Sequence, residues 1–451
     1  MPVKTWFPIL VCLFLISCNQ EQKPQTVEKP EWEHNARVKE YLEAHEKNNR
    51  FNGSILIAQN HEVVHEQYVG SANQELSIPI TDSTLFLIGS ITKPIVAAAI
   101  LTLVRDQKLS LEDRLDQFFP DFPRANEVSI EQLLTHTSGI RDYHYFPDWK
   151  ELSQTDIQPV DVVNQVATDP YRFDPGTGFR YSNTGYILLG LIIEQISNSS
   201  FESYVQDHVL EPMGMENSGV ISNAKTPTNL AIGMTTSPRD ARVADYINYN
   251  QPFTSGNMYS TTADLMKFTQ AIMDSVFFSP EQTAQIFSAG SGHYGMGWGI
   301  RDFDGIGGFG HYGGMNGFWG SVTYLPESQT LICFLTNDDN TPKISITQDL
   351  VAIINDKPYI LPERQTFIPY SKRTAELIEG DYLVKPGDTL HVYSDSAGHF
   401  MQETGQIPYE LFQVGPTSFV MTMQEFVVHI KNDTLRFSGL VNLEAPRIKS
   451  N

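Results

Sequence analysis

The chain has 451 residues, of which 41% are hydrophobic and 19% are charged. This length allows two or three domains with buried cores, and the composition is that of a globular protein. The formal net charge of −22 argues against a nucleic-acid partner, because binding to phosphates requires a basic surface.

The N-terminus has the pattern of a targeting segment. Lys4 precedes an apolar run, Trp6–Ile16, which is too short to span a bilayer and suits the core of a signal peptide. The run ends in Leu-Ile-Ser-Cys at residues 15–18, which looks like a bacterial lipobox. We therefore expect residues 1–17 to be a lipoprotein signal peptide. Cys18 would carry the lipid that anchors a periplasmic or outer-membrane lipoprotein in the cell envelope. The alternative is an ordinary secretory signal.

Residues 18–34 are polar and aperiodic and are expected to form a flexible tether. A larger unit is expected over residues 35–356. Within it, Gly53–Gly70 contains two apolar runs around a polar turn, which predicts a β-hairpin. The segment Ile95–Val104 is apolar nearly all round, which predicts a helix buried in the centre of a domain.

The rest of the chain changes character twice. Mixed helices and loops extend to about Asp274, strand-like and glycine-rich sequence begins at Gly292, and Ile344–Ile354 is expected to form a closing helix. This order predicts one α/β domain whose sheet takes strands from both ends of the unit. Residues 357–372 resemble a Pro-punctuated linker. Residues 373–451 alternate as short strands, which predicts a small β-barrel or sandwich.

The chain contains three cysteines, Cys12, Cys18 and Cys333. Cys12 would leave with the signal peptide and Cys18 would carry lipid, so no disulfide is expected in the mature chain. Cys333 lies in an apolar strand pattern and is expected to be a small core residue. The Cys and His spacing typical of metal sites does not occur, and no metal or other cofactor is expected.

Ser90 and Lys93 stand three residues apart at the start of the apolar helix, so they share one helix face. The N-terminus of a helix favours negative charge at the serine oxygen. Burial would disfavour the charged form of the lysine, which could then act as a base. A second S-x-x-K match, Ser222–Lys225, lies in a polar, Pro-broken stretch with no helix to position it.

Three short motifs occur in the order found in serine β-lactamases and penicillin-binding proteins. They are S-I-T-K at Ser90–Lys93, Y-S-N at Tyr181–Asn183 and H-Y-G-G at His311–Gly314. Flanking stretches such as "LLTHTSGI", "DPGTGFRYSNTGY" and "YGMGWG" also match. From about residue 35 to 355 the chain most resembles the class C β-lactamase-related branch, which includes D,D-carboxypeptidases, D-aminopeptidases and carboxylesterases. The resemblance implies the serine β-lactamase/D,D-peptidase fold, an antiparallel sheet flanked by helices plus a helical subdomain. A small all-β domain would follow it.

The resemblance also implies catalytic roles. Ser90 would attack a carbonyl and form an acyl-enzyme, and Lys93 would take or relay its proton. Tyr181 would serve as base for Ser90 and then as acid for the leaving group, its phenol partly ionised by two nearby cations. Asn183 would hold Lys93 and a substrate amide.

The third motif would complete the site. The backbone N–H groups of Ser90 and Gly314 would form the oxyanion hole, and Gly313 with Gly314 would let the substrate approach the strand. His311 departs from true class C β-lactamases, which have lysine there, and histidine is only partly charged near neutral pH. We therefore expect a small-molecule ester, amide or D-amino-acid peptide substrate. The alternatives are a β-lactamase proper and a penicillin-recognising sensor that acylates without turnover.

Two further features stay open at this point. His136 in "LLTHTSG" is expected to be a structural histidine near a loop rather than a catalytic one. The aromatic tract Arg141–Trp149 either lines the cleft or packs as a surface loop. Met258 and Trp298 are expected in the core or the cleft wall.

Overall fold

The structure is a computed structural model of the full chain. It describes Met1 and residues 32–448 except 147, 169, 238–239, 289, 365, 370, 386–387, 397, 404–408, 422–425 and 440–442. Cys18 and nearly all of the expected signal peptide and tether therefore lie outside the described residues.

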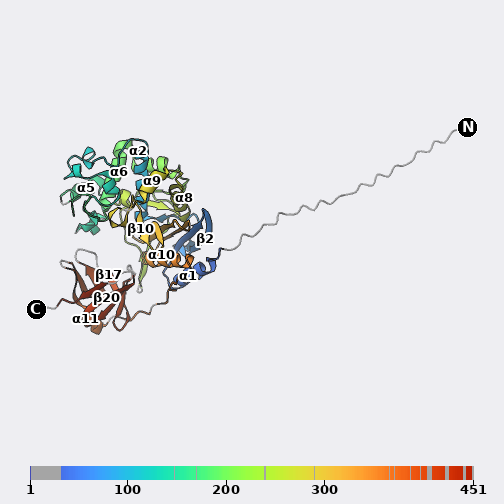
Figure 1. The fold of residues 1–451 in the computed structure, drawn as a ribbon. Coiled ribbons are helices and arrows are strands. Elements are labelled where there is room, and N and C mark those ends of the chain that lie inside the picture. The colour runs from blue at the N-terminus through green and yellow to red at the C-terminus, as the bar shows by residue number, and fades with distance from the viewer. Residues whose placement is uncertain are drawn as a thin grey trace.

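An antiparallel sheet forms the centre of the larger unit (Figure 1). Its six described strands lie in the order β10 (Gly299–Asp302), β11 (Gly307–Met315), β12 (Phe318–Leu325), β13 (Thr330–Thr336), β1 (Gly53–Gln59) and β2 (Glu62–Val69). β1 and β2 form the predicted hairpin, and β1 pairs along its whole length with β13. The sheet thus joins strands from both ends of the unit, as predicted.

Successive side chains of each strand point to opposite faces of the sheet, so the core is divided into two layers. In β1, Ile55 and Ile57 contact one hydrophobic cluster, whereas Leu56 and Ala58 contact the other. The first cluster includes residues of α1 (Asn35–Lys47) and α10 (Lys343–Ile354), and α10 is the predicted closing helix. The second includes α2 (Thr92–Arg105) and α8 (Thr262–Met273). Cys333 is fully buried in β13, as predicted.

A helical subdomain lies between the two groups of strands in sequence and covers the α2 side (Figure 1). Its helices are α3 (Ile130–Leu134), α4 (Trp149–Leu152), α5 (Pro159–Val166), α6 (Asn183–Ser197), α7 (Phe201–Val205) and α9 (Pro280–Ile286). Short 3-10 turns are η1 (Gly89–Ile91), η2 (Leu115–Gln117), η3 (Ala125–Glu127), η4 (Tyr143–Tyr145), η6 (Phe253–Ser255) and η7 (Ser291–His293), and η5 (Gln206–Leu210) is a π-helical turn. Minor strands are β3 (Ser71–Asn73), β4 (Ile78–Pro79), β5 (Phe86–Leu87), β6 (Gly219–Val220), β7 (Met234–Thr236), β8 (Ala241–Val243) and β9 (Met258–Ser260).

The buried helix α2 begins at Thr92 rather than at Ser90, because the 3-10 turn η1 precedes it. Such turns are frequent at the ends of α-helices. Twelve residues of α2 are buried, so the helix is enclosed in the domain as its apolar sequence predicts. Ser90 therefore lies in a tight turn between β5 and a rigid buried helix.

The C-terminal part of the chain is all-β apart from α11 (Lys372–Ile378). Its described strands are β14 (Gly380–Lys385), β15 (Asp388–Ser394), β16 (His399–Glu403), β17 (Tyr409–Gly415), β18 (Ser418–Met421), β19 (Phe426–Lys431), β20 (Thr434–Gly439) and β21 (Leu443–Pro446). Each strand pairs antiparallel with the next, and Tyr382 in β14 pairs with Arg447 after β21, so the sheet closes on itself. The predicted fold class is confirmed, with a nearly barrel-like C-terminal sheet. The predicted domain boundaries stay predictions.

Within the described residues, no helix is long and apolar enough to span a bilayer. The same part of the chain contains no group of three or more His, Cys, Asp or Glu side chains arranged to hold a metal ion.

Candidate active site

Ser90 and Lys93 are joined by a direct hydrogen bond. Lys93 Nζ donates to Ser90 Oγ at 3.0 Å. Ser90 is half-buried and faces a cleft, whereas Lys93 is 0% exposed. The turn η1 followed directly by α2 places the hydroxyl over the first turn of the helix, with the amine beneath it. The two residues predicted from their spacing therefore lie together.

The Lys93 ammonium has two further acceptors. Nζ donates to Asn183 Oδ1 at 2.7 Å and to the Ser255 carbonyl at 2.7 Å, and it lies 4.9 Å from the centre of the Tyr181 ring. Burial lowers the pKa of Lys93 to about 7, although the Asp142 carboxylate partly opposes this shift. A lysine with this pKa is partly neutral near pH 7 and can accept a proton.

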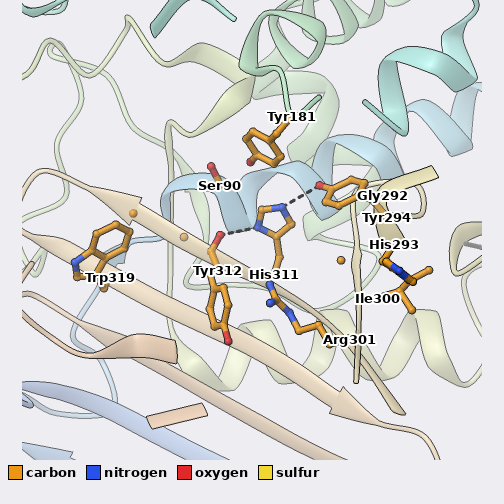
Figure 2. A pocket seen from close by; sticks show the side chains of 13 residues that line it. Ser90, Tyr181, Gly292, His293, Tyr294, Ile300, Arg301, His311, Tyr312 and Trp319 are labelled. Atoms are coloured by element: carbon orange, nitrogen blue, oxygen red, sulfur yellow. Dashed lines mark hydrogen bonds between the residues drawn. The ribbon is translucent and has the colours of Figure 1, made fainter. Parts of the chain in front are cut away.

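Tyr181 borders the same cleft, beside Ser90 (Figure 2). Its hydroxyl is buried, and among the described residues it makes no hydrogen bond of ordinary geometry. Burial raises the pKa of Tyr181 well above its usual value, while the neighbouring Ser90 hydroxyl has a smaller opposite effect. The expectation of a partly ionised phenol is therefore wrong for this state, because burial disfavours the charged phenolate.

Asp142 is the residue that positions Asn183. Its Oδ2 accepts from the Asn183 backbone N–H at 2.5 Å and from the Asn183 side-chain Nδ2 at 2.8 Å. The first bond satisfies a free N–H at the start of α6, where negative charge is favoured. The second bond fixes the amide so that its oxygen faces Lys93. Asp142 belongs to the aromatic tract Arg141–Trp149. This tract therefore positions a residue of the site and does not pack as a plain surface loop.

The Asp142 carboxylate is ionised despite being buried. Burial by itself would raise its pKa, but the charge and hydrogen bonds of His144, with the bonds from Asn183, hold the pKa at about 2. His144 Nδ1 lies 2.9 Å from Asp142 Oδ1, and the histidine side chain is half exposed. A buried cation and a buried anion therefore lie on opposite sides of one asparagine amide.

His136 is buried behind Tyr181, with ring centres 4.2 Å apart. Its Nδ1 accepts from the Ser182 backbone N–H at 3.1 Å, so it anchors the second motif. Burial and the nearby Lys93 charge lower the pKa of His136 well below its usual value. This placement is that of the structural histidine expected from the sequence.

The turn η1 packs directly on the backbone of β11. Gly89 has φ +48°, and a Cβ added to it would lie 2.6 Å from Gly314 N. The backbone of η1 thus comes close to that of Gly314, and Ser90 and Gly314 both border the cleft. A Cβ on Gly313 would clash with the Ile88 carbonyl. Gly313 is therefore required for packing against the segment that leads into the turn holding Ser90, and it also borders the cleft.

His311 is a neutral side chain with both ring nitrogens in use. Its Nδ1 donates to the Tyr312 carbonyl at 2.6 Å, so Nε2 is the acceptor for the Tyr294 hydroxyl at 2.9 Å (Figure 2). Burial and the Lys93 charge lower the pKa of His311 to about 3. The expected partial charge at this position is therefore wrong, because the imidazole is enclosed and its acceptor nitrogen already has a donor.

The cleft has a volume of about 500 Å³. It is lined by Ser90, Tyr181, Gly292, His293, Tyr294, Gly299, Ile300, Arg301, His311, Tyr312, Gly313, Gly314 and Trp319. Figure 2 shows Trp319 and Arg301 on opposite sides of Tyr312, with Ser90 and Tyr181 on the far side of the strand from the Tyr312 ring. Residues from all three motifs thus border one cavity.

The pairing of β11 ends early on the side of this cleft. The described ladder between β10 and β11 runs from Gly307 to Gly310 and stops before the third motif. The other side of this motif is fully paired with β12. The third motif therefore borders the cleft beyond the end of this ladder.

The second S-x-x-K match has none of these features. Lys225 is exposed and its Nζ bonds to Glu202 at 2.6 Å, while Ser222 and Lys225 pair through their backbones. It stands apart from the cleft.

Comparison with known proteins agrees with this geometry. A family model described as Beta-lactamase matches residues 35–354, which is more than half of the chain. The chain belongs to the Beta-lactamase family. The family resemblance predicted from the three motifs is therefore confirmed.

Proteins similar to this chain include a penicillin-binding protein and an esterase. A penicillin-binding protein of Bacillus subtilis (strain 168) is 28% identical over 405 residues, covering 82% of this chain and 88% of that protein. Esterase EstB of Burkholderia gladioli is 28% identical over 296 residues, covering 56% of this chain and 74% of the esterase. The solved structure of an octameric penicillin-binding protein homologue from Pyrococcus abyssi matches with a TM-score of 0.63 at 25% identity, covering 91% of this chain and 99% of that one.

Two residues of this Beta-lactamase-family site were not singled out from the sequence. Asp142 had a weak signal, as one of two acidic residues within the aromatic-rich tract Arg141–Trp149. Arg301 had none, because only the fold brings the end of β10 to the third motif.

Proposed function

We propose that the chain is a serine hydrolase that cleaves an ester or amide bond through an acyl-enzyme on Ser90. The observation that carries this proposal is the buried Lys93 amine, bonded to the Ser90 hydroxyl at 3.0 Å and with its pKa lowered to about 7. An amine of this kind is a suitable base for a serine nucleophile near neutral pH.

The positions of Ser90, Lys93 and Tyr181 give each residue a role in forming the acyl-enzyme. Neutral Lys93 accepts the proton of the Ser90 hydroxyl as Oγ forms a bond to the substrate carbonyl carbon. The backbone N–H groups of Ser90 and Gly314 stabilise the negative oxygen of the tetrahedral intermediate. Tyr181, protonated because its pKa is raised, donates its proton to the leaving oxygen or nitrogen as that bond breaks. The proton held by Lys93 then restores Tyr181.

Deacylation uses the same groups in reverse. Neutral Lys93 accepts a proton from a water molecule as the water oxygen bonds to the acyl carbon. The bond to Ser90 Oγ then breaks, and the proton returns to the serine. Serine, lysine and tyrosine therefore end in their starting states, and one ester or amide bond has been hydrolysed.

Neutral His311 favours esters and amides over β-lactams. A β-lactam presents a carboxylate, and this imidazole has no charge and no free nitrogen to receive it. The likeness to an esterase supports an ester substrate, and a D-amino-acid peptide of the cell wall remains part of the proposal.

Active-site labelling tests this function. The purified protein is treated with a fluorophosphonate probe and then assayed with p-nitrophenyl acetate, a D-alanyl peptide and nitrocefin, alongside Ser90→Ala. Labelling and turnover that disappear in Ser90→Ala support the proposal, and equal turnover by Ser90→Ala overturns it. A penicillin label that is never released would indicate the sensor alternative, and nitrocefin turnover as fast as ester turnover would indicate a β-lactamase proper.

We also propose that the chain is a lipoprotein of the bacterial cell envelope. The support is the pattern of residues 15–18 ahead of Cys18 and the polar segment that follows it. Metabolic labelling with a radioactive fatty acid is expected to mark the wild type and not Cys18→Ser. Equal labelling of the two would overturn the proposal.

A further inference from the structure

The half-exposed His144 contacts both residues that hold the proposed base, yet the proposed reaction gives it no role. His144 Nδ1 lies 2.9 Å from Asp142 Oδ1 and 3.0 Å from Asn183 Nδ2, and the His144 backbone N–H donates to the same Asp142 oxygen at 2.8 Å. Asn183 Oδ1 in turn accepts from Lys93 Nζ at 2.7 Å. A continuous set of contacts therefore leads from the imidazole to the amine that would activate Ser90.

The charge of Asp142 decides where the imidazole carries its proton. This carboxylate is ionised and can only accept hydrogen bonds, so His144 Nδ1 is the donor of the pair. Nδ1 therefore cannot accept from Asn183, whose Nδ2 donates to Asp142 Oδ2 at 2.8 Å. An imidazole with its proton on Nδ1 and an imidazolium both make the bond from Nδ1, so the contact does not depend on the charge of His144.

Aromatic rings hold the imidazole beside this carboxylate. The His144 ring stacks on that of Tyr143, with centres 4.3 Å apart, and meets the edge of Trp149 at 5.3 Å. The rings of Tyr143 and Trp149 are themselves 4.4 Å apart. Packing on two sides restricts rotation of the imidazole, so its Nδ1 stays directed at Asp142.

Hydrogen bonds to the Asp142 carboxylate affect Lys93, because this negative charge raises the pKa of Lys93 against the effect of burial. Two of these bonds come from His144 and two from Asn183. Each donor compensates part of the negative charge. The bond from His144 Nδ1 therefore limits how strongly Asp142 stabilises the Lys93 ammonium.

The other titratable side chains that face Lys93 or Asp142 do not change charge near pH 7. Burial shifts the pKa of each in the direction that favours its neutral form. They are His136, Tyr143, Tyr181, Tyr186 and His311.

We propose that His144 is a positioning residue that sets the pH at which Lys93 becomes a base, by holding the Asp142 carboxylate through Nδ1. The proposal rests on the proposed serine hydrolase function and adds a control of the pH range of that site. His144 is absent from the described residues that line the cavity, so it acts through Asp142 and Asn183 rather than on the substrate.

The acid limb of kcat/KM tests this role. Hydrolysis of p-nitrophenyl acetate by the full chain is followed over pH 5–9, and turnover by Ser90→Ala is subtracted. His144→Phe retains an aromatic ring and removes the donor, so more of the Asp142 charge acts on Lys93. The limb is then expected to move to higher pH, by about 0.5–1 unit. His144→Leu also lacks the donor and is expected to move the limb in the same direction.

Rescue and background separate this role from a structural one. His144→Asn, whose amide nitrogen can take the place of Nδ1, is expected to restore most of the wild-type limb. Asp142→Asn removes the charge through which His144 acts, so adding His144→Phe to Asp142→Asn is expected to leave the limb unmoved. The position of the limb does not depend on how much of a variant is correctly folded.

His391→Phe is the matched control. His391 Nδ1 lies 2.6 Å from Asp381 Oδ1 in the C-terminal barrel, and its side chain is 48% exposed against 50% for His144. This variant is expected to keep the wild-type limb. An unmoved limb in both His144→Phe and His144→Leu, a move to lower pH, or an equal shift with and without the Asp142 carboxylate overturns the proposal. Absence of Ser90-dependent turnover by wild type would instead overturn the hydrolase function itself.

Discussion

The lowered pKa of Lys93 results from its burial away from solvent. The side chain is 0% exposed, and its three hydrogen-bond acceptors are a hydroxyl, an amide oxygen and a backbone carbonyl, none of which is charged. Neutral acceptors only partly replace the solvation of an ammonium, so the neutral amine becomes accessible near pH 7.

The first prediction concerns the pH dependence of the reaction. Because neutral Lys93 is the active form and its pKa is lowered to about 7, kcat/KM is expected to fall about tenfold per pH unit below pH 7. Lys93→Ala should lower the acylation rate roughly 10²- to 10⁴-fold, since a general base is removed. Stopped-flow acylation over pH 5–9 measures both. Lys225→Ala, in the unused S-x-x-K match, is the control and should retain wild-type rates.

The second prediction concerns Asp142, which acts on Lys93 through Asn183. Its negative charge raises the Lys93 pKa, so Asp142→Asn should lower that pKa and move the acid limb of kcat/KM to lower pH. The rate on the plateau should also fall, because the Asn183 amide loses a charged partner. A change in plateau without any movement of the limb would contradict the electrostatic role. Asp106→Asn, an acid on the protein surface, is the control.

The residues of the site were predictable to the extent that they lie within short motifs. Ser90 with Lys93 and Tyr181 with Asn183 are recognisable because one turn of chain fixes their spacing. The neutrality of His311 was not predictable, since it depends on Tyr294, which lies 17 positions away in sequence and reaches its Nε2 only in the folded chain.

At the scale of elements, the contact between η1 and β11 brings two of the three motifs together. Gly89 in η1 lies against Gly314, and Gly313 lies against Ile88, so two glycines allow the backbones to approach without side chains between them. The sequence predicted the apolar helix and the glycine-rich strand. It did not predict that Gly89 lies against Gly314 and Gly313 against Ile88, because that depends on which backbone lies opposite.

The third prediction distinguishes the effect of the contact between η1 and β11 from the effect of backbone strain at a glycine. Gly89→Ala introduces a Cβ 2.5 Å from the Gly314 carbonyl oxygen at a residue with φ +48°. Gly305→Ala is the matched control, with φ +86° and no atom within 4 Å of the added Cβ. Both substitutions should cost about 1–2 kcal/mol of unfolding free energy from the left-handed conformation. Only Gly89→Ala should also abolish labelling by a fluorophosphonate; equal labelling of both variants would contradict the proposed oxyanion site.

At the scale of the whole molecule, the hydrophobic cores are separate. The clusters that pack on the two faces of the central sheet share no residue with the cluster inside the C-terminal barrel. Residues 357–364 and 366–369, between them, contain no helix or strand. The sequence predicted an all-β C-terminal part from its change in periodicity. The closure of the barrel, through Tyr382 and Arg447, required long-range pairing that periodicity does not encode.

The fourth prediction follows from that separation. Phe419→Ala, in the barrel core, should destabilise the barrel by about 3–5 kcal/mol and leave kcat/KM unchanged. Phe268→Ala, in α8 and buried to the same degree, should destabilise the larger unit and lower activity. Differential scanning calorimetry with parallel ester assays measures both. A parallel loss of activity in Phe419→Ala would show that the two cores are energetically coupled.

The pairing of β1 with β13 has a consequence for biosynthesis. Gly53 lies opposite Thr336, so the first strand emerges from the ribosome long before the strand beside which it ends. At translation speeds of 5–20 residues per second, this delay is on the order of tens of seconds. The nascent hairpin therefore has one uncovered edge for that time, and an uncovered strand edge can pair with another chain.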